Sequence, residues 1–77
     1  MNSEQRRVRE EAVAALRQAM AHQMYGSSQL LMAQAAIVCD DRGELCEKLR
    51  IADAEHQLAF KHLEEARQKL TYEELFK

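Results

Sequence analysis

Asp53 and His56 are the residues whose types and spacing come closest to supporting chemistry. They lie three positions apart in the stretch "ADAEHQLAFKHL", residues 52–63. Side chains three apart on a helix share one face, so this pair could offer a carboxylate oxygen and an imidazole nitrogen to one metal ion. A second interpretation needs no metal. His56 could be a buried histidine that hydrogen-bonds Gln23 or Asp53 and sets the register of two packed helices.

The other histidines and the methionines give weaker signals. We expect His22 and His62 beside a packing seam and partly exposed, where neither has an obvious ligand partner. Met20, Met24 and Met32 carry soft sulfur ligands of the kind that copper prefers. Methionine at helical spacing more often fills a hydrophobic core, and that is the interpretation favoured here.

Cys39 and Cys46 are separated by six residues across a predicted turn. This spacing fits neither a zinc site nor a redox motif, so both are expected to be small, reduced core residues, although Cys39 could join the methionines as a sulfur ligand. No glycine-rich phosphate loop is present, and no spacing sets a cysteine beside a histidine. No catalytic residue is predicted.

The composition indicates an all-α protein with one small domain, residues 1–77. The chain has no proline, only two glycines and many strong helix formers. A net charge of -2 gives no electrostatic footprint for nucleic acid. The start "MNSEQRRVREE" lacks the apolar core of a signal peptide, and no segment has the apolar length of a membrane span. A cytoplasmic location, or enclosure in an intracellular assembly, is therefore expected.

Capping residues predict two long helices. Ser3 can cap a helix that begins at Glu4, and Asp41 with Glu44 forms a capping-box-like start for a helix that runs to about Leu70. The same pattern in "TYEELFK" predicts a short helical turn at the C-terminus. Gly26 and the two serines after it could break the first helix. Because the apolar pattern stays in phase on both sides, we expect the helix to continue to Cys39.

Apolar positions at steps of three and four predict that the two helices pack as an antiparallel hairpin. On the first helix the expected seam is Val13, Leu16, Met20, Gln23, Ser27, Leu30, Gln34 and Ile37. On the second helix it is Leu45, Leu49, Ala52, His56, Ala59, Leu63, Ala66 and Leu70. Folding about residues 40–43 then sets Gln23 at the level of His56. The charges of Glu55, Lys61, Glu64 and Glu65 are expected on the outer face.

Residues 18–39 contain no charged side chain and are apolar on nearly every face. A helix that is apolar all round is buried on more than one side, and a lone hairpin covers only one. We therefore expect association, as a two-fold dimer that forms a four-helix bundle or with a partner helix. The expected interface is Val13, Leu16, Met20, Met24, Ser27, Leu30, Leu31, Ile37, Leu49, Ala52, Ala59 and Leu63.

The stretches "AMAHQMYGSSQLLMAQAA" and "DAEHQLAFKHL" resemble the first two helices of the ferritin-like superfamily, over roughly residues 16–66. In size the chain is most similar to the short encapsulated ferritins, which are hairpins that dimerise. The resemblance implies a metal site at the dimer interface, with Gln23, Asp53 and His56 at the ligand positions. The family has glutamate where this chain has Gln23 and Asp53. Gln23 removes a charge and Asp53 shortens the reach of the carboxylate by one methylene. Both changes argue against ferroxidase-type activity, the only enzymatic candidate, and leave weaker binding of iron or another divalent metal.

Two functions follow from these patterns. The first is a non-enzymatic protein-interaction module, such as a self-associating scaffold, an adaptor or a small co-chaperone, that uses the uncharged face of residues 18–39. In shape, though not in any motif, this resembles the hairpin subunits of type III secretion needle-chaperone complexes. Its expected partner is another copy or a helical protein. The alternative is a ferritin-like metal-binding protein with a weakened site at the dimer interface.

Overall fold

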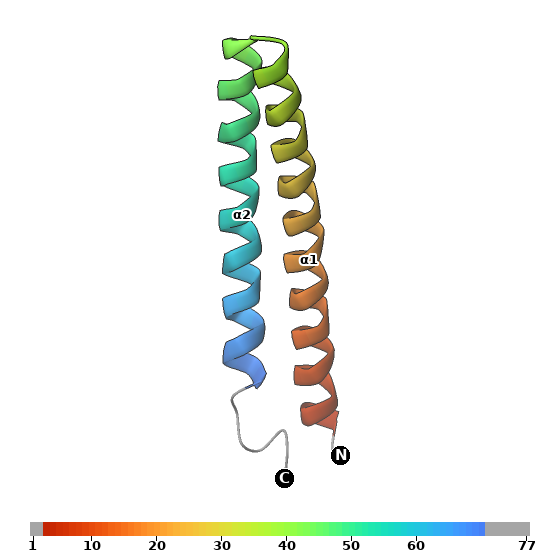
Figure 1. The fold of residues 1–77 in the computed structure, drawn as a ribbon. Coiled ribbons are helices and arrows are strands. Elements are labelled where there is room, and N and C mark those ends of the chain that lie inside the picture. Colours follow the sequence, from red (N-terminus) through yellow and green to blue (C-terminus); the bar gives the residue numbers. More distant parts are fainter. Residues whose placement is uncertain (1–2, 71–77) are drawn as a thin grey trace.

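The computed structural model describes residues 3–70, which form two long antiparallel helices (Figure 1). Helix α1 spans Ser3–Val38 and helix α2 spans Arg42–Leu70. They lie side by side along their whole length, as a rod of 57 × 13 × 13 Å. The expected all-α hairpin is confirmed.

Helix α1 continues through Gly26 without a break, as the unbroken apolar phase predicted. Gly26 is buried, and a Cβ atom added there would lie 2.6 Å from Cδ2 and 2.7 Å from Nε2 of His56. The missing side chain therefore makes room for the imidazole ring of α2. This contact gives a reason for a glycine at a position where it costs about 1 kcal/mol of helix propensity.

The turn between the helices is closed by two backbone hydrogen bonds at the end of α1. The Asp40 N–H donates to the Ile37 carbonyl (3.1 Å), and the Asp41 N–H donates to the Ala36 carbonyl (2.9 Å). Asp40 has a φ of 57°, so it is the left-handed residue that this Schellman-type ending requires. Gly43 does not fill that role, because its φ is not positive.

Helix α2 starts with the predicted cap. The Asp41 Oδ1 atom accepts a hydrogen bond from the Glu44 backbone N–H at 3.0 Å, which satisfies one of the free donors of the first turn. Helix α1 begins at Ser3, one residue before the predicted start, and α2 ends at Leu70 as expected. The predicted C-terminal turn falls in residues 71–77, outside the described residues.

The contact between the helices is built from small side chains. The buried hydrophobic residues are all alanines: Ala12, Ala15, Ala33, Ala36, Ala52, Ala59 and Ala66. On α2 they are seven apart. On α1 they form one series with the buried Gly26 and Gln29, with steps of 3, 11, 3, 4 and 3, as a coiled-coil seam requires. Because alanine projects only a methyl group, the two backbones can approach closely, and no large side chain is fully buried among the described residues.

The predicted seam of the first helix is therefore wrong by one position. Ala12, Ala15 and Ala33 are buried, and the residue after each of them is exposed. The exposed set includes every predicted seam residue of this helix: Val13, Leu16, Met20, Gln23, Ser27, Leu30, Gln34 and Ile37. The two patterns have the same spacing, and the hairpin buries the smaller side chains because these let the helices pack closest.

The second-helix seam is correct in part. Ala52, Ala59 and Ala66 are buried and His56 is half-buried, whereas Leu49 and Leu63 are exposed. The exposed leucines directly follow or precede contact positions and lie at the edge of the contact.

The cysteine and methionine expectations also need correction. Cys39 and Cys46 are both free and exposed rather than in the core, because they lie near the turn and outside the alanine contact. Met20, Met24 and Met32 are exposed too, so none fills the core of the hairpin. Within residues 3–70 neither helix combines the length and the hydropathy that crossing a membrane demands.

Candidate functional site

A shallow apolar groove runs between the helices at the mid-length of the rod. It has a volume of about 550 Å³ and is open to solvent along one side. Helix α1 contributes Leu16, Ala19, Met20 and Gln23, and α2 contributes His56, Ala59, Phe60 and Leu63. No residue in this lining is an acid, a lysine or an arginine.

The groove is the central part of a longer surface, here called the open face. Residues seven apart on a helix lie on the same side, so the groove positions continue along α1 to Val13, Leu30 and Ile37 and along α2 to Leu49. All four of these side chains are exposed. The open face is therefore a stripe of large apolar side chains that runs beside the alanine contact.

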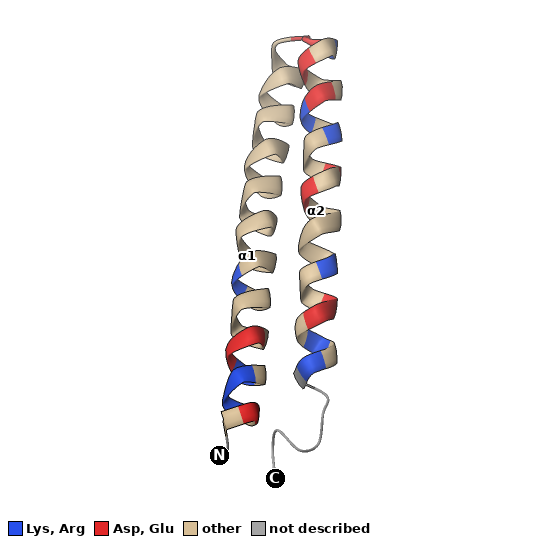
Figure 2. Ribbon diagram, turned by 180° about the vertical axis from the view of Figure 1, so that it is seen from behind, with Lys and Arg blue, Asp and Glu red and all other residues tan. Residues whose placement is uncertain are grey.

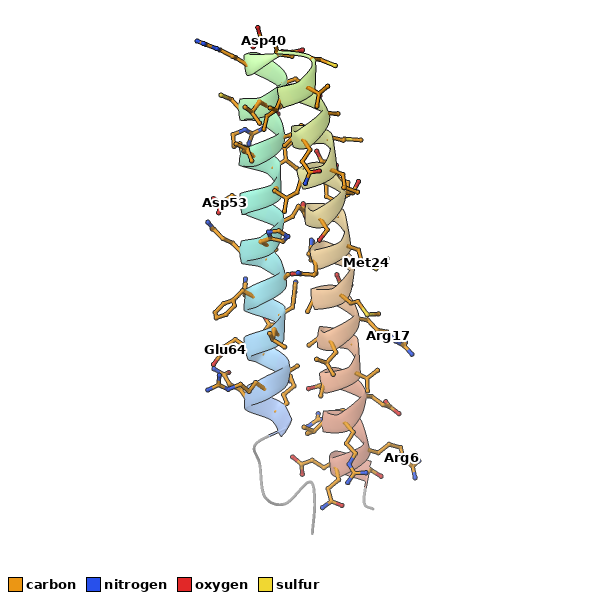
Figure 3. The ribbon with its side chains drawn as sticks, viewed as in Figure 1. Arg6, Arg17, Met24, Asp40, Asp53 and Glu64 are labelled. Carbon is orange, nitrogen blue, oxygen red and sulfur yellow. The ribbon has the colours of Figure 1, made fainter. Side chains whose placement is uncertain are left out.

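The rest of the uncharged segment widens this apolar surface on the outer side of α1. Met24, Leu31 and Val38 are seven residues apart, and Leu31 is 67% and Val38 86% exposed. Met24 points away from α2 (Figure 3). Figure 2 shows that α1 carries no charge from residue 18 to its end, whereas charges are spread along α2.

Ten of the twelve predicted interface residues are exposed, and the structure brings most of them to the open face or beside it. The other two, Ala52 and Ala59, are buried in the contact between α1 and α2. Sequence reasoning missed Phe60, which is 69% exposed and lines the groove. The predicted seam of the second helix passed through Ala59 and Leu63 and left Phe60 out.

His56 has an unusual environment at the groove. Its ring packs on Gly26, and its Nε2 atom is buried with no hydrogen-bond partner among the described residues. Gln23 lines the same groove, so the two residues do lie at one level, as the hairpin register predicted. Among the described residues, His56 Nε2 does not make the predicted hydrogen bond to Gln23 or Asp53.

Asp53 does not point into the hairpin. It is exposed and directed away from α1 (Figure 3), and its Oδ2 atom accepts a hydrogen bond from Gln57 Nε2 at 3.0 Å. The expectation that Asp53 and His56 both face inward is therefore wrong for Asp53. Residues three apart on a helix lie about 60° apart around its axis, so at the edge of a narrow contact His56 reaches the contact while Asp53 stays outside it.

The donor set of one chain does not fit a di-iron centre. Gln23 and His56 are neutral donors, and the Asp53 carboxylate is turned outward. Within residues 3–70 no three His, Cys, Asp or Glu side chains lie close enough together to hold a metal ion. Metal binding at Gln23, Asp53 and His56 stays a prediction that would need groups from more than one chain.

A polar cluster on the other side of the alanine contact was not predicted. His22 Nδ1 lies 2.5 Å from Glu55 Oε2, and His62 Nδ1 lies 3.3 Å from Glu65 Oε2. The His22 and His62 rings stack with centroids 5.5 Å apart and planes 6° from parallel. These half-buried groups tie α1 to α2 and help fix the register of the hairpin.

Glu55 is thus a contact residue and not a solvated charge of the outer face, which corrects the prediction. A signal was present in the sequence. His22 lies seven residues after Ala15, and Glu55 lies three residues after Ala52, so both continue the alanine spacing. Lys61 is exposed as expected.

Two ion pairs that shift the pKa values of their members lie away from the groove. Lys69 Nζ donates to Glu11 Oε2 at 2.7 Å, and this hydrogen bond, with the lysine charge, lowers the pKa of Glu11 from its ordinary value. Arg50 likewise donates to Glu47 at 2.6 Å; the hydrogen bond and the paired charges lower the pKa of Glu47 and raise that of Arg50. Both pairs are exposed, so their contribution to stability is small.

Comparison with protein-family models, with curated proteins and with solved structures finds no match for this chain. The functional argument therefore rests on the geometry of the hairpin.

Proposed function

We propose that this protein is a helical protein-interaction module that binds an apolar helical partner across its open face. One observation carries the proposal. The hairpin buries alanines between its helices and leaves most of its large apolar side chains exposed. In a protein that acts alone, the large side chains form the core, because their burial supplies most of the stability.

The form of the groove also suits a helix and not a small ligand. It is open along its length, apolar and free of charged groups. Small-molecule sites are normally concave and carry a few convergent polar groups. Here His56 and Gln23 are the polar groups of the lining, and the remaining six residues are apolar. A partner helix could lay an apolar stripe into this groove.

A matched pair of variants tests the proposal. Leu16 lines the groove and is 40% exposed; Leu58 is 39% exposed but lies two residues, or about 200°, around α2 from Phe60. We expect the wild-type protein to sediment above its chain mass of 8.9 kDa or, when dilute, to bind an apolar fluorescent dye. Leu16→Glu should abolish both properties, and Leu58→Glu should preserve them.

The proposal fails if the wild-type protein is a stable monomer at millimolar concentration that binds no dye. It also fails if the two glutamate variants behave alike while both keep the helical circular dichroism of the wild type. The same samples, measured with and without added iron, test the predicted metal site. Iron that leaves both mass and melting temperature unchanged would exclude a metal-dependent assembly.

A further inference from the structure

Three exposed residues of α2 form a stripe with opposite charges at its two ends. Asp53, Phe60 and Arg67 are spaced by seven, so they lie on one side of the helix. The carboxylate and the guanidinium stand on either side of Phe60, each about 10.5 Å from it along the axis. All three are exposed, so the stripe is available to a second molecule.

The centre of this stripe coincides with the centre of the groove. Phe60 and Met20 both line it, and the lining extends about one turn beyond them in each direction, to Leu16 and Gln23 on α1. Met20 is also at the mid-length of α1, which spans Ser3–Val38. The groove, the apolar stripe and the charge pattern therefore share one midpoint.

We infer that the partner on the open face is a second copy of this chain, related by a two-fold axis perpendicular to the helices at the level of Met20 and Phe60. This inference rests on the proposed function and specifies its partner. The axis sets α2 antiparallel to α2 of the other copy. It brings Asp53 of each copy to the level of Arg67 of the other, so two opposite-charge contacts flank a central cluster of Phe60 and Met20 side chains.

The alternative two-fold dimer has its axis parallel to the helices and both turns at the same end. In that arrangement Asp53 shares its level with Asp53 of the other copy, and Arg67 with Arg67, so the two residues do not pair with each other. Electrostatic complementarity at the rim of an interface selects register and orientation more than it adds affinity. The charge pattern therefore selects the antiparallel dimer.

Neither charge is held firmly within its own chain. Asp53 accepts one hydrogen bond from Gln57, and Arg67 Nη1 lies 3.7 Å from Glu64 Oε2. Exposed pairs of this kind contribute little to stability, so both side chains can turn toward a second copy.

Charge reversal tests the inference by sedimentation equilibrium of the full chain. Asp53→Arg and Arg67→Asp each create two like-charge contacts per dimer, and each should raise the dimer Kd by about tenfold. The double variant Asp53→Arg/Arg67→Asp restores both contacts and should return the Kd to within about threefold of the wild type. Lys61→Asp is the control, because it changes net charge as Arg67→Asp does but lies beside the stripe.

Two results would overturn the inference. The first is that the single reversals raise the dimer Kd no more than Lys61→Asp does. The second is that the double variant raises the dimer Kd as much as the two single effects combined. If either occurs while Leu16→Glu still dissociates the wild-type assembly, the proposed function stands and only this arrangement is wrong. A wild-type protein that neither associates nor binds dye would instead contradict both the proposed function and this arrangement.

Disulfide trapping gives an independent measurement of the axis. Phe60→Cys in a Cys39→Ser/Cys46→Ser background should form a covalent dimer on mild oxidation, because the two copies of position 60 meet at the axis. Cys46 lies 14 residues from Phe60, which separates its two copies by about 42 Å. A covalent dimer through Cys46 in the wild-type protein, together with no covalent dimer from the Phe60→Cys variant, would contradict the antiparallel arrangement.

Discussion

At the scale of single residues, the packing of His56 on Gly26 joins the two helices at the groove. The glycine sits in a helix interior, where alanine is favoured by about 1 kcal/mol. The imidazole occupies the space that an alanine methyl group would need, with Cδ2 at 2.6 Å and Nε2 at 2.7 Å. Helix propensity and packing therefore oppose each other at this position.

Because the two effects oppose each other, Gly26→Ala should change the melting temperature in opposite directions in the two backgrounds of a double-mutant cycle. Gly26→Ala should lower the melting temperature of the wild-type protein, because the ring must leave its place. In a His56→Ala background the same substitution should raise the melting temperature, since only the propensity gain of about 1 kcal/mol remains. Thermal unfolding followed by circular dichroism measures both. A stabilising Gly26→Ala in the wild type would show that the ring moves at no cost.

At the scale of the elements, small side chains set the distance between α1 and α2. The alanines of the contact leave no room for a branched side chain without moving a backbone. Their spacing keeps this short distance along the rod, from Ala12 in the first third of α1 to Ala36 in its last turn. The stability of the hairpin therefore depends on small residues at these positions rather than on bulk.

Ala33 and Ala35 offer a matched test of this idea. Ala33 is buried in the contact, and Ala35 is exposed two residues away. Ala33→Leu should destabilise the hairpin by about 1–3 kcal/mol through overpacking. Ala35→Leu should change it by less than about 0.5 kcal/mol, as surface substitutions normally do. Urea unfolding of the two variants gives both values, and equal effects would mean that the contact is loose enough to accept leucine.

At the scale of the whole molecule, the hairpin is a thin rod with most of its large apolar side chains on the outside (Figure 3). Short chains bury a small fraction of their surface and commonly need oligomerisation for stability. If the open face is covered in the assembled protein, then part of the folding free energy comes from association.

The unfolding transition should therefore depend on protein concentration. Mass action makes the folded dimer more stable as concentration rises, by about 1.4 kcal/mol of dimer for each factor of ten. For a chain of this size that corresponds to a rise in Tm of roughly 3–6 °C per tenfold increase. Calorimetry over a hundredfold concentration range measures it. A constant Tm for the wild type, equal to that of Leu16→Glu, would show that the monomer is stable on its own.

The sequence by itself determined the two helices, their cap at Asp41, the continuity through Gly26 and the antiparallel register that sets Gln23 level with His56. These follow from local rules: propensity, capping and the period of the helix. It also determined that the uncharged segment has more apolar surface than a hairpin can cover.

Only the tertiary structure decided which side of each helix is buried. On α1 the alanine positions and the large apolar positions have the same spacing and differ by one residue, so periodicity cannot rank them. The choice depends on the free energy of packing two backbones at the short distance that alanine allows. That packing also turned Asp53 outward, brought His22 against Glu55, and left Met20 and Phe60 on an open face.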